Sequence, residues 1–273
     1  MLFPLFDLNP HNRFPLVTLL LIAANVVVAG FTLTQSEKRL NQVAMEYGFI
    51  PARLSQVGQG KVLEAPVFAI NRQTGKPERV GKVDLSTKTA DVYRTFLTTM
   101  FLHGGWWHLI MNMWMLWVFG NNIEDRLGHF VYLLFYVLGG VVATLAFWAS
   151  NPNGLTPVIG ASGAVAAVLG GYAITFPTAK VRTLIFFLLF VIVDLPAMLV
   201  LGIWFALNVV SGLIGMWGVV LEPVAFWAHI GGFVAGMILM PIFTLGASPP
   251  GTDWRKETEE MFRFEDPRFR SDT

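Results

Sequence analysis

Residues 130–149 read FVYLLFYVLGGVVATLAFWA, and this uncharged stretch decides the fold class. At about 1.5 Å per residue, a helix of that length matches the ~30 Å hydrocarbon core of a bilayer. The whole chain has the same character, since 54% of its 273 residues are hydrophobic, 14% are charged and the mean hydropathy is +0.57. A soluble domain has about 25% charged residues. The sequence therefore predicts an all-α polytopic membrane protein.

Apolar segments of spanning length recur along the chain and predict a bundle of six transmembrane helices. They are 15–34, 97–119, 130–149, 158–176, 195–213 and 225–245. A further apolar run, 183–194, is too short to span and is expected to be re-entrant or interfacial. If it did span, the bundle would have seven helices, which is the main alternative.

Lysine and arginine are distributed unevenly between the short loops, and this predicts the orientation of the bundle. The short loops 150–157 and 214–224 hold neither residue. The basic residues on the side of the termini include Arg13, Arg126, Lys180 and Arg182. We therefore expect both termini in the cytoplasm, and an integral protein of a bacterial inner (plasma) membrane. The net charge of +1 suggests no nucleic-acid partner, and the lack of cysteine excludes a cysteine nucleophile.

Polar segments surround the predicted membrane core. Residues 1–14 form an N-terminal cytoplasmic segment, and the charged residues 246–273 form a cytoplasmic tail. Residues 35–96 form a large extracytoplasmic insertion between the first two spans, in which turn residues around Thr74-Gly75 predict a β-hairpin. The spans within 97–245 make the candidate catalytic core.

Ser162 and His229 are predicted to meet within the membrane. Each lies about four residues into a span that runs in the same direction, so both are expected roughly 6 Å below the same membrane face. An imidazole inside a bilayer is costly and usually functional. His108 and Asn112 lie one turn apart on the second span, with His108 about 11 residues into it. That distance would place His108 deeper than the pair.

Small residues predict that the fourth and sixth spans pack closely. Gly163, Ala167 and Gly171 recur at intervals of four, and Gly232 and Gly236 form a second pair with the same spacing. Such stripes let two helix backbones approach each other in lipid. A hydrogen bond between Ser162 and His229 is therefore sterically reasonable.

A serine and a histidine within reach of each other indicate nucleophilic catalysis, because the imidazole can take the hydroxyl proton. The oxyanion that forms needs donors, and the candidates are His108, the Asn112 amide and the Ser162 backbone N–H. Asp194 and Glu222 lie outside the spans. The expected arrangement is therefore a Ser–His dyad without a carboxylate.

These residues resemble the rhomboid intramembrane serine proteases over roughly 93–240. The matching motifs, separated in the chain, are His103-Gly104-Gly105-Trp106-Trp107-His108-Leu109-Ile110-Met111-Asn112, Glu124-Asp125-Arg126, Gly160-Ala161-Ser162-Gly163 and Ala228-His229-Ile230-Gly231-Gly232.

The resemblance implies a six-helix core that cleaves transmembrane proteins near the outer membrane face, with the lipid bilayer as its surroundings. It implies that Ser162 is the nucleophile and His229 the base, with His108, Asn112 and the Ser162 amide forming the oxyanion hole. It also implies a structural ion pair between Glu124 and Arg126. Neither a cofactor nor a metal is expected.

Two positions depart from the family pattern. Tyr93-Arg94 stands where Trp-Arg is common, and Ala166 stands where many members carry a tyrosine that stacks on the histidine. Another aromatic residue, Trp227 or Trp107, is expected to hold His229.

Other functions fit the sequence less well. A catalytically idle relative that binds membrane proteins would typically have lost Ser162 or His229, and both are present. A transporter would want charges along its spans, which are nearly free of them. A zinc protease would want His-Glu-x-x-His, which does not occur. If the protein is a protease, the loop 214–224 and the span that holds Trp204 and Phe205 are candidates for a lid or lateral gate.

Overall fold

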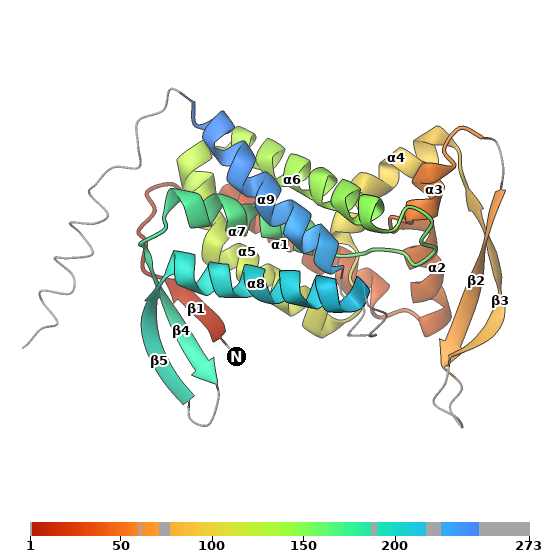
Figure 1. The fold of residues 1–273 in the computed structure, drawn as a ribbon, viewed down its shortest axis with the longest axis horizontal. Coiled ribbons are helices and arrows are strands. Elements are labelled where there is room, and N and C mark those ends of the chain that lie inside the picture. The colour runs from red at the N-terminus through yellow and green to blue at the C-terminus, as the bar shows by residue number, and fades with distance from the viewer. Residues whose placement is uncertain (1, 60–61, 71–76, 187–189, 217–224, 246–273) are drawn as a thin grey trace, which may run out of the picture.

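The computed structural model describes residues 2–59, 62–70, 77–186, 190–216 and 225–245. It is a helical bundle with a small β-structure at each end (Figure 1). The bundle helices are α1 (Leu16–Thr32), α5 (Trp106–Leu127), α6 (His129–Ser150), α7 (Ser162–Thr175), α8 (Ala197–Met216) and α9 (Phe226–Phe243). Of the described helices, α6, α8 and α9 are long and apolar enough to cross a membrane, and α1 and α7 are shorter apolar helices. The mostly helical membrane fold is confirmed at this level.

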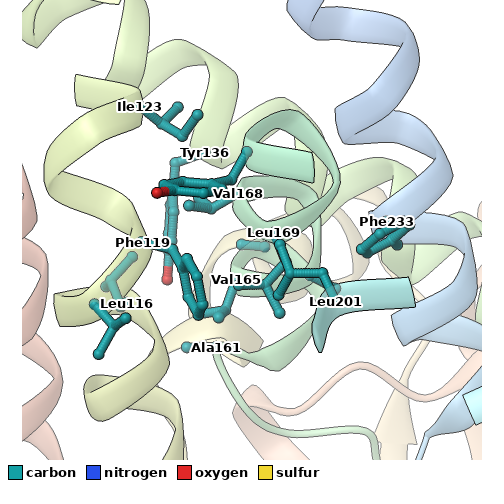
Figure 2. Close-up of a cluster of buried hydrophobic side chains, with 14 of the residues drawn as sticks. Leu116, Phe119, Ile123, Tyr136, Ala161, Val165, Val168, Leu169, Leu201 and Phe233 are labelled. Atoms are coloured by element: carbon teal, nitrogen blue, oxygen red, sulfur yellow. The ribbon is translucent and has the colours of Figure 1, made fainter. Parts of the chain in front are cut away.

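The central helix of the bundle is α7, which packs against α5, α6, α8 and α9. Its side chains from Ala164 to Ala173 are all buried, as expected for a helix that is apolar on every side. In Figure 2, Val165 lies between Phe119 of α5 and Phe233 of α9, and Val168 lies beside Tyr136 of α6. With 14 residues, α7 is about 20 Å long, which is shorter than a bilayer's hydrocarbon core. A transmembrane helix of this length would have one end below a membrane face.

The second predicted span, 97–119, is wrong in its boundaries. Its first residues belong to the end of α4 (Thr89–Thr98) and to a short 3-10 turn, η1 (Thr99–Phe101), and α5 begins only at Trp106. Gly104 and Gly105 interrupt the apolar run, and Gly105 is fully extended, with a φ of 174°. At the other end the helix continues through Gly120-Asn121-Asn122 to Leu127, because the buried Asn122 amide has a partner in Asp7.

The described residues of the apolar run 183–194, which are 183–186 and 190–194, belong to strands and not to a re-entrant segment. β1 (Leu2–Asp7), β4 (Lys180–Phe186) and β5 (Phe190–Pro196) make an antiparallel sheet in the order β1-β4-β5. β-branched residues recur along β4 and β5, and they favour strands over a helix. Arg182 and Asp194 face each other in the register and form a bidentate ion pair at 2.8 and 3.0 Å. That pair stabilises the sheet.

The insertion between α1 and α5 is folded and contains the predicted hairpin. Its elements are α2 (Glu37–Tyr47), α3 (Pro51–Ser55), β2 (Val62–Ile70), β3 (Pro77–Ser86) and α4. β2 and β3 pair antiparallel, and the predicted turn at Thr74-Gly75 lies outside the described residues. The buried Arg53 donates to the carbonyls of Ser86, Glu46 and Asp91 and so ties these elements together. Phe49 forms a two-way backbone bridge with Val158, which joins the insertion to the segment before Ser162.

Asp7 connects the N-terminal strand to the helices of the core. Its Oδ2 atom accepts from the Tyr172 hydroxyl at 2.7 Å and from the Asn122 amide at 2.6 Å. Burial raises the pKa of Asp7 from its ordinary 3.8 to about 7, against the opposing effect of the Tyr172 hydrogen bond. The folded state therefore favours the protonated acid.

Asp7 should make the protein less stable as pH rises from about 4 to about 7. In that window the unfolded state loses the proton while the folded state keeps it, so the free energy of unfolding falls, by up to roughly 4 kcal/mol, and then levels off. Asp7→Asn should flatten this slope in thermal unfolding of the detergent-solubilised protein. Asp84→Asn, at an exposed site on β3, is the control and should leave the slope unchanged. An unaltered slope in Asp7→Asn would contradict the assignment.

Candidate active site

Ser162 is the first residue of α7, not the fourth as the sequence suggests. The backbone conformation just before Ser162 depends on Gly160, which has a φ of +131°. Residues with a side chain rarely adopt this φ. A Cβ atom at Gly160 would also lie 2.8 Å from the His108 ring and 3.5 Å from the Ser162 Oγ. Gly160 therefore lets the His108 ring lie beside the serine.

His229 is the fourth residue of α9, and its Nε2 lies 2.8 Å from the Ser162 Oγ. The expected proximity of the two side chains is present. Close packing of α7 and α9 explains it, because a Cβ at Gly232 would lie 2.2 Å from the Gly163 carbonyl oxygen and one at Gly236 would lie 1.9 Å from that of Ala167. The two backbones touch along the small-residue stripes.

The surroundings of His229 differ from the prediction. The imidazole Nδ1 lies 2.8 Å from the Asn208 Oδ1, and the Trp204 ring packs on the imidazole with centroids 5.7 Å apart. Both residues are on α8. Trp107 is 71% exposed, and Trp227 lies beside Gly212, so neither fills the role that was expected of it.

Asn208 was missed in the sequence, although a signal was present. It is the only amide side chain in the 20 residues of α8, whose other side chains are apolar apart from Ser211. A lone amide in an apolar span needs a partner, and this one is 7% exposed.

His108 lies in the first turn of α5, because that helix begins at Trp106. The late start of the helix corrects the expectation that His108 is deeper than the pair. Asn112 follows one turn later, is 5% exposed and donates one amide N–H to the His108 carbonyl at 2.9 Å. His103 packs edge-on against His108, with centroids 5.1 Å apart.

The predicted ion pair between Glu124 and Arg126 is absent from the described residues. The fully buried Glu124 lies 2.6 Å from the His129 Nδ1 and accepts from the Val17 and Thr18 amides at 2.7 and 2.8 Å. Those amides belong to the first turn of α1, where a carboxylate is favoured. Glu124 thus joins α5, α6 and α1, whereas the buried Arg126 Nε has no hydrogen-bond partner among the described atoms.

The arrangement brings together groups that acyl transfer requires. A hydroxyl bonded to an imidazole is the pairing needed for nucleophilic attack, and a backbone N–H at a helix start lacks an intrahelical partner and can bind an anion. As expected, Asp194 is remote from the pair, since it bonds Arg182 in the sheet. Glu222 and most of the candidate lid 214–224 lie outside the described residues.

Curated relatives align with parts of the chain. Rhomboid-like protein 11, chloroplastic, of Arabidopsis thaliana is 41% identical over 70 residues, which cover 26% of this chain and 25% of that protein. Rhomboid protein 1, mitochondrial, of Saccharomyces cerevisiae is 33% identical over 34% of this chain and 28% of its own length. RHOMBOID-like protein 1 of Arabidopsis thaliana is 27% identical over 81% of this chain and 52% of its own length. The chain thus spans at most about half of these relatives.

The names of the relatives contradict the predicted bacterial inner membrane. Where the name of a relative includes a compartment, that compartment is the chloroplast or the mitochondrion. The assignment to a bacterial inner membrane was therefore wrong, and so was the assignment of both termini to the cytoplasm. The distribution of basic residues reports which loops share a side but does not identify the membrane.

The family model described as the Rhomboid domain matches residues 90–245, which is more than half of the chain and contains the Ser162–His229 pair. The resemblance seen in the separated motifs is confirmed, and the chain belongs to the rhomboid family.

Proposed function

We propose that this chain is an intramembrane serine endopeptidase that hydrolyses peptide bonds of transmembrane proteins. The observation that carries the proposal is the 2.8 Å hydrogen bond between the Ser162 Oγ and the His229 Nε2. His229 takes the proton as Ser162 attacks the peptide carbonyl, and then gives it to the leaving amine. Water then hydrolyses the acyl-enzyme: His229 takes a proton from the water as it attacks the ester, and returns it to the Ser162 oxygen as the acid product leaves. The intact pair favours this function over that of an idle relative.

The proposed topology has six spans, formed by α1, α5, α6, α7, α8 and α9. It places 1–14 and 246–273 on one side of the membrane and 35–96 on the other, with 97–245 as the catalytic core. Ser162 lies at the end of α7 that adjoins the insertion, as the bridge between Phe49 and Val158 supports. Because α7 is short, cleavage is expected just below that membrane face.

The proposed oxyanion hole consists of His108, Asn112 and the Ser162 backbone N–H. The His108 ring borders the serine through Gly160, and the Ser162 N–H is one of the free donors at the start of α7. The Asn112 amide has two N–H groups, and only one is needed for the His108 carbonyl. The second can serve the oxyanion.

Labelling with a fluorophosphonate probe tests the proposed function. The probe should phosphonylate the detergent-solubilised protein, and mass spectrometry should place the adduct on the peptide that contains Ser162. Proteoliposomes with a model transmembrane substrate should yield a cut within or next to its membrane segment. An unlabelled protein, or an adduct on another serine, would contradict the proposal.

Asn112→Ala should lower kcat for the transmembrane substrate about 100-fold, because the loss of one oxyanion donor removes stabilisation of the transition state. KM should change little. Asn121→Ala, on the same helix but bonded to His11, is the control and should keep full kcat. A loss that appears mainly in KM would assign Asn112 to substrate binding.

A further inference from the structure

Asn208 contacts the proposed base on the side away from the serine. The imidazole of His229 lies between two partners, with Ser162 at Nε2 and Asn208 at Nδ1, each at 2.8 Å. A neutral imidazole carries one proton, on either nitrogen. Only the form with the proton on Nδ1 leaves the Nε2 lone pair free to accept the serine proton. Catalysis therefore depends on what faces Nδ1.

The orientation of the Asn208 amide is fixed by its own helix. Its Nδ2 lies 2.9 Å from the carbonyl oxygen of Trp204, one turn earlier in α8. A carbonyl can only accept, so the NH2 group must face it and the amide oxygen must face His229. An amide oxygen can also only accept, and Nδ1 must therefore be the protonated nitrogen.

We propose that Asn208 is the positioning residue that holds His229 in the tautomer competent as a base. The inference rests on the proposed function and extends it from a dyad to a Ser–His–Asn arrangement spread over α7, α9 and α8, in which Asn208 orients His229 and transfers no proton. An asparagine in this role would fail if its NH2 group turned toward Nδ1, since that would demand the wrong tautomer. The bond to the Trp204 carbonyl prevents this rotation.

The turn of α8 that precedes Asn208 also fixes the orientation of the His229 ring, through Trp204. Trp204 packs on the imidazole at an interplanar angle of 33° and on Phe233 of α9 at 36°. It thus supplies an aromatic contact that Ala166 cannot provide from α7. Ala166 is fully buried, and its Cβ would lie 3.2 Å from a Cβ placed on Gly232. The α7–α9 interface therefore has no room for a tyrosine at position 166.

The test compares Asn208→Ala with Asn25→Ala. Asn25 is also a buried amide, 0% exposed against 7% for Asn208, and it too donates to the carbonyl one turn earlier, at Leu21, but it lies in α1 away from the dyad. Asn208→Ala should lower the rate constant for phosphonylation of Ser162 about 10- to 100-fold without weakening the initial binding of the probe, whereas Asn25→Ala should leave both unchanged. Equal rates for wild type and Asn208→Ala would overturn the inference.

A spectroscopic readout separates positioning from a structural role. In protein labelled with 15N-histidine, the His229 signals, identified by their loss in His229→Gln, should show a protonated Nδ1 and an unprotonated Nε2. Asn208→Ala should convert them to a mixture of tautomers. An unchanged tautomer in that variant would overturn the inference even if the rate fell. Absence of probe labelling in the wild type would instead count against the proposed function.

Discussion

Ser162→Ala should abolish cleavage of a transmembrane substrate, with kcat falling by about five or six orders of magnitude. Losses of this size follow from removing the nucleophile of a serine protease, since the remaining groups can only bind substrate and stabilise charge. Among the described residues, the His229 ring forms hydrogen bonds with Ser162 and Asn208. Ser162 is the only hydroxyl of these two partners, so His229 has no other hydroxyl to activate in the described part of the chain. Cleavage in proteoliposomes, followed by gel mobility, measures the effect.

Ser211→Ala is the matched control for that experiment, because Ser211 is a serine in the neighbouring apolar helix α8. It should cleave at the wild-type rate. Both variants should melt at the wild-type temperature, since removing one hydroxyl leaves the helix packing intact. If Ser162→Ala retained more than a trace of activity, another nucleophile would have to be sought.

Gly236→Ala should both destabilise the protein and inactivate it. The added methyl group would lie 1.9 Å from the carbonyl oxygen of Ala167, and backbone cannot yield as a flexible side chain would. The α7 and α9 helices must then separate, at a cost of about 3 kcal/mol or more. Since Ser162 and His229 are held by these same two helices, the hydrogen bond between them should lengthen and probe labelling should fall with stability.

Gly202→Ala provides the contrast, because nothing lies within 4 Å of a Cβ at that position in α8. Alanine is the better helix former by up to about 1 kcal/mol, so this variant should be as stable as wild type or more so. Thermal unfolding in detergent, together with the labelling rate, measures both effects. If Gly236→Ala were as stable as the wild type, α7 and α9 would have to be packed less closely than in the structure.

The pairing of Ser162 with His229 could be predicted because it depends on coarse features. Topology places both residues on helices of the same direction, and a few residues of error in a helix end move a side chain by only a few ångströms. The small-residue stripes Gly163-Ala167-Gly171 and Gly232-Gly236 likewise predict close packing without exact boundaries. The structure confirms that approach of the two helices.

The misplaced elements share a physical cause, which is that hydropathy does not distinguish between conformations. The strand residues 183–186 and 190–194 are as apolar as the residues of a membrane helix, and only pairing with β1, distant in the sequence, decides between strand and helix. The start of α5 depends on Gly104-Gly105, which a hydropathy window averages away. The first error concerns strand pairing over a long range in the sequence, and the second concerns local backbone geometry at two glycines.

The partners of buried polar groups were the least predictable part of the site. Glu124 and Arg126 suggest a local ion pair, yet Glu124 bonds the start of α1, more than a hundred residues earlier. Asn208 contacts His229 across the interface between α8 and α9. Such choices depend on how helices face one another, and a single sequence does not contain that information.

The packing of α7 also has a consequence for biosynthesis. The helix that carries Ser162 is translated before α9, yet its backbone is covered by Gly232 and Gly236 of α9, the last helix among the described residues. A nascent chain that ends before Phe226 lacks the base and leaves the Gly163–Ala167 surface without its partner. The proposed proteolytic activity therefore requires that α9 has been synthesised and packed against α7, and a chain that stops earlier should be inactive.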